Sequence, residues 1–147
     1  MSTREQAMTA LLAKLAGAYA FGVVARRNPR DPATVAAPGG PPALILWQHE
    51  EDTEVRAINQ PPKRTITAVA VVYLTLAPDD ENTVIDTIFN AIAGAVDAAL
   101  SQDNPATGTC TLGGAVVSAR IDGKSVRDSS GETGLGFMVI PIAIILP

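Results

Sequence analysis

The residues with the most chemical potential lie in one short polar run, His49–Glu54. His49 is the only histidine of the chain. The carboxylates that follow it are Glu50, Glu51, Asp52 and Glu54. A histidine beside carboxylates could exchange protons or bind a metal ion, but a metal site needs several ligands at defined spacing, and a second histidine is lacking. The run is therefore more typical of a solvated face than of a catalytic or metal site.

The remaining candidates for chemistry are isolated. Cys110 is the single cysteine, so no disulfide forms within the chain, and nothing in the sequence pairs with it for catalysis. Gly113-Gly114 and Gly134-Leu135-Gly136 predict turns, because neither belongs to a phosphate-binding motif. We expect no catalytic, cofactor-binding or metal-binding residue, and hence no enzyme. A small cytosolic α+β enzyme or ligand-binding domain stays open as an alternative.

Length and composition predict a single domain over residues 1–147 with an aliphatic core. The chain has 147 residues, of which 47% are hydrophobic and only 4% aromatic, and its net charge is −4. Residues 1–64 hold eight Lys or Arg against six Asp or Glu, whereas residues 65–147 hold three against nine. The acidic balance argues against general nucleic-acid binding. No signal peptide or membrane-length apolar run is present, so we expect a soluble protein of a reducing cytoplasm.

Two amphipathic helices are predicted, over Ser2–Ala25 and Thr83–Leu100. In the first, Ser2 and Glu5 have capping-box spacing. Its apolar stripe consists of Met8, Leu11, Leu12, Leu15 and Tyr19. The stripe of the second helix consists of Ile85, Ile88, Phe89, Ile92, Val96, Ala99 and Leu100. Asn82 or Thr83 is expected to cap this second helix.

Two strands are predicted between the helices, over Ala43–Gln48 and Lys63–Ala77, and they are expected to pair antiparallel. The polar run that follows Gln48 either extends the first strand or forms the end of a hairpin. The second strand alternates with period two. The face formed by Ile66, Ala68, Ala70, Val72, Leu74 and Leu76 should receive the helices. The opposite face, rich in Thr, Val and Tyr73, could be wet or could meet another chain.

The C-terminal third predicts further strands. Ala115–Ile121 is rich in β-branched residues, and Asp122-Gly123 predicts a hairpin with Lys124–Arg127 as its return arm. Asp128–Gly134 is expected to be a loop. Leu135–Leu146 carries no charge and is apolar on both faces, which is typical of a strand covered on both sides. Because Pro141 has no N–H, this strand should have a second neighbour that is interrupted or comes from another chain.

These elements predict an α+β fold: a mixed, mainly antiparallel sheet with two amphipathic helices packed on one face. The strand after Leu100 could cross over to a parallel neighbour with a right-handed connection. The proline-rich segment 28–42 is long for a connection within a compact domain. We interpret it as an arm or loop that could lie on a neighbouring subunit.

Several motifs occur in an order that resembles the tail terminator (tail completion) proteins of long-tailed bacteriophages. They begin with the helix that ends near Arg26-Arg27, the proline-rich connector and the P-A-L strand at Pro42–Leu44. They continue with Asn90-Ala91-Ile92 and Asp97–Leu100 in the second helix, then TLGG at Thr111–Gly114 and IPI at Ile140–Ile142. Each motif alone indicates the family only weakly, whereas their order over nearly the whole chain is moderately specific for it. Asn59–Lys63 departs from the family, which carries an aromatic-containing stretch there.

The resemblance implies a structural virion protein rather than an enzyme. Such subunits form a ring, expected to be a homohexamer, at the head-proximal end of the tail tube. The implied partners are other copies of the chain, the tail tube protein and the neck or connector proteins of the head. DNA would pass through an acidic bore without specific binding, and no membrane would be involved. The protein would be assembled in the host cytoplasm and would then belong to the virion. A neck or head-completion ring protein is the alternative.

Residues for these contacts follow from the charge pattern, under the assumption of head-to-tail contacts in a ring. For the subunit interface we predict Arg26, Arg27 and Arg30 on one side and Asp79, Asp80 and Glu81 on the other. The loops predicted to face the tube or the neck contain Glu50, Glu51, Asp52, Glu54, Asp122, Lys124, Arg127, Asp128 and Glu132.

Overall fold

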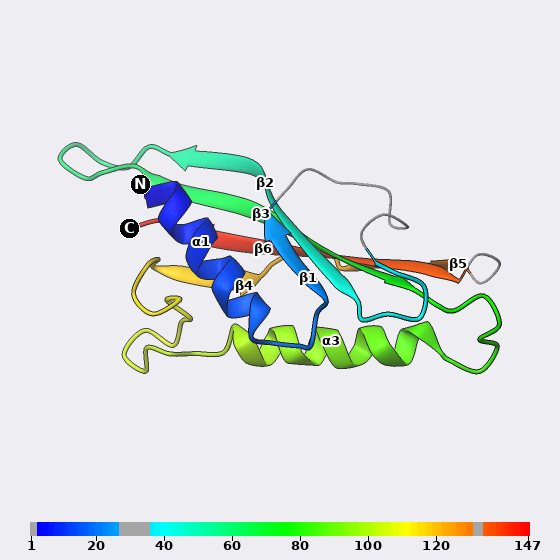
Figure 1. Ribbon diagram of the computed structural model, residues 1–147. Coiled ribbons are helices and arrows are strands. Elements are labelled where there is room, and N and C mark those ends of the chain that lie inside the picture. Colours follow the sequence, from blue (N-terminus) through cyan, green and yellow to red (C-terminus); the bar gives the residue numbers. More distant parts are fainter. Residues whose placement is uncertain (1–2, 27–35, 131–133) are drawn as a thin grey trace.

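The computed structural model describes residues 3–26, 36–130 and 134–147, and it places two helices on one face of a six-stranded sheet (Figure 1). The elements in chain order are α1 (Thr3–Ala16), β1 (Val23–Arg26), β2 (Ala43–Glu54), β3 (Lys63–Thr75), α3 (Ile85–Ala99), β4 (Ser118–Ile121), β5 (Val126–Ser130) and β6 (Leu135–Ile145). The predicted α+β fold is confirmed.

The sheet has the order β1-β2-β3-β6-β4, and β5 also pairs with β6. The pairs β2–β3, β3–β6, β4–β6 and β5–β6 are antiparallel, whereas β1 runs parallel to β2. The strand after α3 has the same direction as β3, but the two are not neighbours, because β6 lies between them. The expectation that this strand crosses over to a parallel neighbour is therefore wrong, because the parallel strand is not adjacent to it. The last strand of the chain fills that place.

The strand partner of β6 is interrupted opposite Pro141, as the missing N–H of proline predicts. β4 ends where Ile121 pairs with Ile142, and β5 begins where Val126 pairs with Val139. In the gap, the Asp122 N–H donates to the carbonyl oxygen of Pro141 at 3.1 Å. The first of the two expected alternatives, an interrupted neighbour within the chain, is confirmed.

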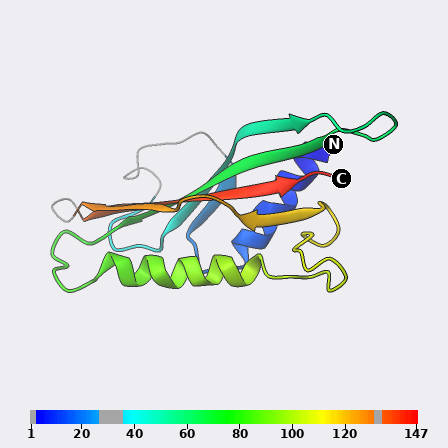
Figure 2. The same cartoon turned by 180° about the vertical axis from the view of Figure 1, so that it is seen from behind.

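The predicted hairpin at Asp122-Gly123 is wrong. β4 and β5 pair with β6 rather than with each other, and they follow one another along the same side of it (Figure 2). Gly123 has a φ of +109°, and a Cβ there would lie 3.3 Å from Cγ of Pro141. The turn-prone pair thus carries the chain past the proline instead of reversing it. The expected loop at Asp128–Gly134 is also shorter, because β5 extends to Ser130.

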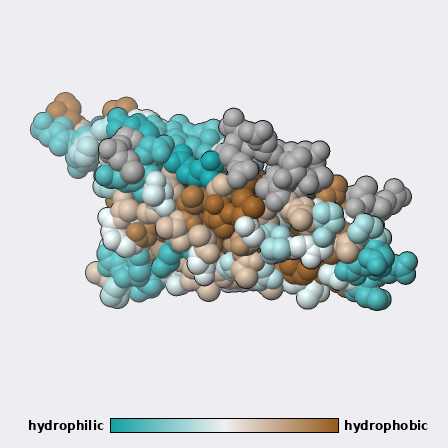
Figure 3. All heavy atoms as spheres, viewed as in Figure 1, coloured by the Kyte–Doolittle hydropathy of each residue, from teal (hydrophilic) through white to brown (hydrophobic). Residues whose placement is uncertain are grey.

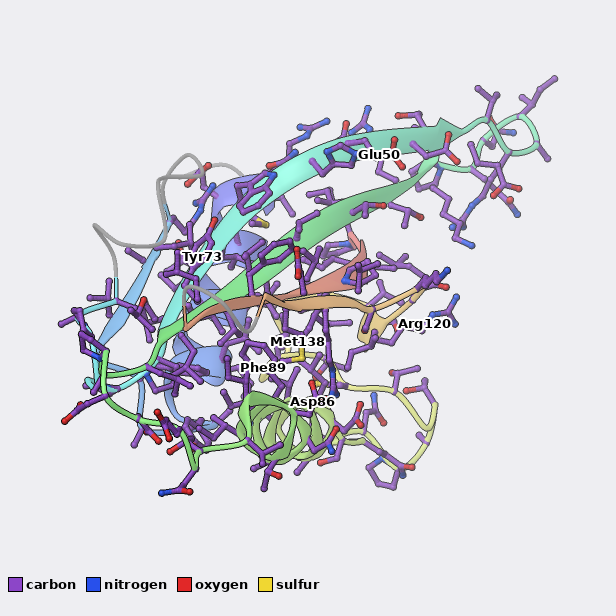
Figure 4. The ribbon with its side chains drawn as sticks, turned by 90° about the vertical axis from the view of Figure 1, so that its right-hand side faces the viewer. Glu50, Tyr73, Asp86, Phe89, Arg120 and Met138 are labelled. Atoms are coloured by element: carbon purple, nitrogen blue, oxygen red, sulfur yellow. The ribbon has the colours of Figure 1, made fainter. Side chains whose placement is uncertain are left out.

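The helix-facing side of the sheet is a continuous aliphatic core. Ile66, Ala68, Ala70, Val72 and Leu74 of β3 are buried there with Met138, Ile140, Ile142 and Ile144 of β6. The helices contribute Met8, Leu11 and Leu15 from α1 and Ile85, Phe89, Ile92 and Val96 from α3. Figure 4 shows Phe89 and Met138 in the layer between α3 and the sheet. The predicted face of β3 and the two predicted stripes therefore form the core.

The first helix is shorter than predicted. It ends at Ala16 rather than at the predicted Ala25, and Val23–Arg26 is the edge strand β1. Gly17 and Gly22 weaken the helix beyond Ala16, and the β-branched Val23 and Val24 favour a strand. Pairing with β2 then fixes that strand, and the Gly22 N–H donates to the Pro42 carbonyl oxygen at 2.9 Å.

The second helix begins at Ile85, with Val84 at the N-cap position and no side-chain cap. The expected cap by Asn82 or Thr83 is therefore wrong. Asp80 instead accepts hydrogen bonds from the backbone N–H groups of Asn82 and Thr83, at 3.1 and 3.0 Å. The polar residues organise the turn before the helix rather than its first turn.

The opposite face of the sheet is also apolar. Ala43, Ile45, Val71 and Tyr73 form a second buried cluster with Ala36, and Trp47, Val69, Phe137 and Val139 pack against it while half-buried. In the proline-rich segment, the described residues 36–42 lie against the chain's own sheet. The Gly39 N–H, for example, donates to the Thr75 carbonyl oxygen at 2.8 Å. The part of the predicted arm from 28 to 35 lies outside the described residues.

Candidate functional site

The acidic run after Gln48 lies on a sheet edge that projects from the body of the protein (Figure 1). β1 pairs with β2 only as far as Leu46, so among the described strands the outer edge of β2 from Trp47 to Glu54 has no partner. The register shifts between Gln48 and Glu50. Charged side chains and a bulge both discourage unwanted strand pairing at an open edge. This placement explains the carboxylates physically, without a catalytic role.

One of these carboxylates fastens the projecting strand to the first helix. The guanidinium of Arg4 donates to both oxygens of Glu51, from Nε at 2.5 Å and from Nη2 at 2.9 Å. The arrangement is bidentate, which adds directional specificity to an exposed pair. It lowers the pKa of the Glu51 carboxyl, chiefly through the side-chain hydrogen bond from Arg4. The base of the hairpin is thereby held in one orientation.

The tip of the β2–β3 hairpin exposes apolar side chains. Val55 is 87% exposed and Ile58 is 91% exposed, and Asn59 has a φ of 72° in the turn. Figure 3 shows apolar atoms at the far end of this projection, beyond a hydrophilic stretch. Sequence reasoning treated 59–62 as a plain turn and missed the pair. Both residues precede that turn, and neither belongs to a periodic apolar pattern that would have drawn attention to it.

A hollow of about 380 Å³ lies before α3, close to the predicted acidic turn. Its lining combines the apolar Leu76, Val84 and Ile85 with the carboxylates of Asp80, Glu81 and Asp86, together with Pro78, Thr83 and Gly134. Val84 is 59% exposed at its rim. Hydrogen bonds from Thr83, followed by the Asn82 backbone, lower the pKa of Asp80. Among its lining residues the hollow has apolar walls and acidic groups, and no cation.

The predicted interface arginines are only partly described. Arg26 pairs with Glu5 of α1, and its Nη1 and Nη2 lie 2.6 and 3.3 Å from the two carboxylate oxygens. The same contact, through its side-chain hydrogen bond, lowers the pKa of Glu5. Arg27 and Arg30 lie outside the described residues. Asp79, Asp80 and Glu81 form the turn after β3, so their role at an interface stays a prediction.

The predicted tube- or neck-facing residues lie in two places that the register connects. Glu50 pairs with Thr67, Thr67 with Ala143, and Ala143 with Arg120, so the acidic edge and β4 share one row across the sheet. Figure 4 shows Glu50 on β2 and Arg120 on β4, at the two ends of that row. The exposed residues beyond β4 are Asp122, Lys124, Arg127 and Asp128. Glu132 lies outside the described residues, and the facing role of this set stays a prediction.

The TLGG motif is a tight loop built around Asp103. Leu112, Gly113 and Gly114 all have positive φ, at 52°, 73° and 95°. The Asp103 carboxylate accepts from the Thr111 and Gly113 N–H groups at 2.7 and 3.1 Å. These backbone hydrogen bonds lower the pKa of Asp103. Sequence reasoning did not single out this aspartate, which lies eight residues before its main partner.

Asp103→Asn is expected to destabilise the protein at neutral pH and to matter less in acid. The folded-state pKa is lowered, so the carboxylate contributes stability above its unfolded pKa of about 4, and this contribution is lost as the pH falls through the folded pKa. Melting temperatures between pH 7 and pH 3 should therefore converge for the two proteins. Asp97→Asn, at an exposed position of α3, is the matched control. A constant difference across the range would contradict the assignment.

The residues first considered for catalysis are not gathered into a site. His49 is exposed on β2, and Cys110 is a buried free thiol. Within the part of the chain that the structure describes, no three His, Cys, Asp or Glu side chains are arranged to hold a metal ion. No helix among the described residues is long and apolar enough to cross a membrane.

Comparison with known proteins adds one structural likeness. No family model matches the chain, and no curated protein matches it in sequence. A chain from a solved structure described as the virion of a native gene transfer agent particle is similar at a TM-score of 0.44 and 13% identity. The alignment covers 98% of this chain and 90% of that one.

Proposed function

We propose that this protein is a structural component of a phage or phage-like tail, and that copies of it form a ring at the head-proximal end of the tail tube. The ring ends tube polymerisation and offers a surface to the neck proteins of the head. The observation that carries the proposal is the ordered set of terminator-like motifs, from the N-terminal helix to the IPI strand.

The fold supports this proposal by giving the strongest motifs a defined place. IPI lies in β6, which pairs with β3, β4 and β5. TLGG lies in the loop that returns the chain from α3 towards β4, and its backbone donates hydrogen bonds to the Asp103 carboxylate. The sequence resemblance thus rests on residues that shape the sheet and its connections, rather than on scattered surface positions.

The surface supports an assembling protein rather than an isolated one. The sheet face away from the helices carries the half-buried Trp47, Val69 and Val139, and the hairpin tip exposes Val55 and Ile58. Apolar surface of this kind commonly marks a protein interaction site. The acidic surface suits a bore through which DNA passes without being held.

The test is to polymerise tail tube protein with and without this protein and to measure tube lengths by electron microscopy. A terminator should give shorter tubes that carry one ring at a single end, and native mass spectrometry should show the ring as a closed multiple of the subunit. Unchanged tubes without rings would contradict the proposal. Co-purification with tailless heads rather than headless tails would favour a neck or head-completion ring instead.

A further inference from the structure

We propose that the tip of the β2–β3 hairpin of one copy docks into the acidic hollow before α3 of the next copy. This contact rests on the proposed function in that it supplies the head-to-tail interface of the ring. It differs from the arginine interface predicted from sequence, because its cations come from the hairpin. The occupant of the hollow is thus a second copy of this chain.

The two surfaces are chemically complementary. From Val55 to Arg64 the chain holds the cations Arg56, Lys63 and Arg64 and no acidic residue. Lys63 lies opposite Glu54 in the register, so Arg56 is the cation that extends beyond the paired strands. The hollow presents the opposite charge from Asp80, Glu81 and Asp86. Complementary potentials of this kind fix the orientation of partners and suppress wrong pairings.

The apolar parts are complementary as well. Val55 and Ile58 stand almost fully in solvent at the tip, and Leu76, Val84 and Ile85 line the hollow. Exposed aliphatic side chains gain free energy when they enter an apolar recess, at roughly 25 cal/mol per Å² of apolar area buried. A charged rim around an apolar centre is the usual composition of a protein interface.

The geometry excludes contact within one chain. The hairpin tip and the connection from β3 to α3, whose residues line the hollow, lie at opposite ends of the molecule in both ribbon views (Figures 1 and 2). β3 connects them with its 13 residues, a span of about 40 Å at the usual strand rise. The tip can therefore reach this hollow only on another copy. A contact between two different surfaces is heterologous, and it gives a ring when the repeated rotation closes and a helical filament when it does not.

Cysteine cross-linking tests the contact directly. Ile58→Cys and Val84→Cys are made separately in a Cys110→Ala background, mixed, and oxidised in the presence and in the absence of tail tubes. We expect a disulfide-linked dimer that neither variant gives alone. Ile58→Cys mixed with Val126→Cys is the matched control, because Val126 is 47% exposed on β5. No cross-link in either condition, or an equal yield with the control, would overturn the proposal.

A charge exchange gives an independent readout. Arg56→Glu and Glu81→Arg should each weaken self-association by about tenfold, and the double variant should recover most of the loss. Losses that simply add in the double variant would count against the contact. If the cross-link forms but tubes are never capped, the proposed function fails and the contact stands. If the wild-type protein caps tubes but the mixed cysteine variants give no cross-link on them, the contact fails and the proposed function stands.

Discussion

Phe89→Ala is expected to lower the free energy of unfolding by about 3–5 kcal/mol, the usual loss for a fully buried phenylalanine. Phe89 is 0% exposed and is the largest of the fully buried side chains of the described core. It lies over Gly136 of β6, where an added Cβ would come within 3.3 Å of the ring. The glycine lets α3 approach the sheet closely, and its lack of a side chain leaves room for the Phe89 ring.

Urea denaturation followed by circular dichroism measures this loss, with Thr87→Ala as the matched control. Thr87 lies on the exposed side of the same helix, so its truncation should change stability by no more than about 0.5 kcal/mol. A similar midpoint for the two variants would show that α3 does not pack on β6 as described. The contrast therefore tests the layer that positions the hollow, since the hollow lies directly before α3.

The faces of the sheet could be predicted from the sequence because burial leaves a periodic trace. The alternation of β3 assigned every second residue from Ile66 to Leu74 to the helix-facing core, and the spacing of Phe89 and Ile92 assigned the inner side of α3. Pro141 predicted the break between β4 and β5, because a residue without an N–H cannot donate a hydrogen bond to a continuous neighbouring strand. Each of these signals depends only on the residue and its near neighbours.

The pairing of strands could not be predicted so well, because it depends on which partners compete. Asp122-Gly123 is a strong local hairpin signal, yet β6 is a longer apolar partner for both β4 and β5. Val23–Ala25 was assigned to the end of the first helix, whereas pairing with the edge of β2 fixes it as part of strand β1. A local pattern says nothing about such competition.

The interface residues predicted from the sequence stay a prediction, although the structure shows where some of them lie. The acidic turn Asp79–Glu81 was predicted to lie at a subunit interface, and two of its residues, Asp80 and Glu81, line the hollow. The opposing cations were predicted to be Arg26, Arg27 and Arg30. The structure pairs Arg26 with Glu5, and the other two lie outside the described residues. The exposed Ile58 was overlooked because hydropathy patterns show where apolar residues are buried, and a single apolar residue in a turn carries no period.

Ile140→Asp is expected to abolish stable folding, whereas Val139→Asp should leave a folded protein. Ile140 is 1% exposed on the helix side of β6, so an aspartate there would be an unpaired buried charge, which costs at least about 3–5 kcal/mol. Val139 is the next residue along the strand and points to the opposite face, where it is half-buried between Val71 and Val126 of the adjacent strands. There the carboxylate can reach water, and a loss of about 1–2 kcal/mol is expected.

Thermal melting of the two variants measures the difference, and tube capping by Val139→Asp shows what the second face does. A folded variant that no longer joins rings or tubes would place that face in the assembly, since the same aspartate would be tolerated in the monomer and rejected at the contact. A folded variant that caps tubes normally would indicate that this face stays exposed to solvent in the assembly. Equal unfolding of both variants would contradict the two-sided sheet. Because adjacent residues of a strand point to opposite faces, this pair of variants distinguishes the face of β6 that packs against the helices from the face that is available for partners.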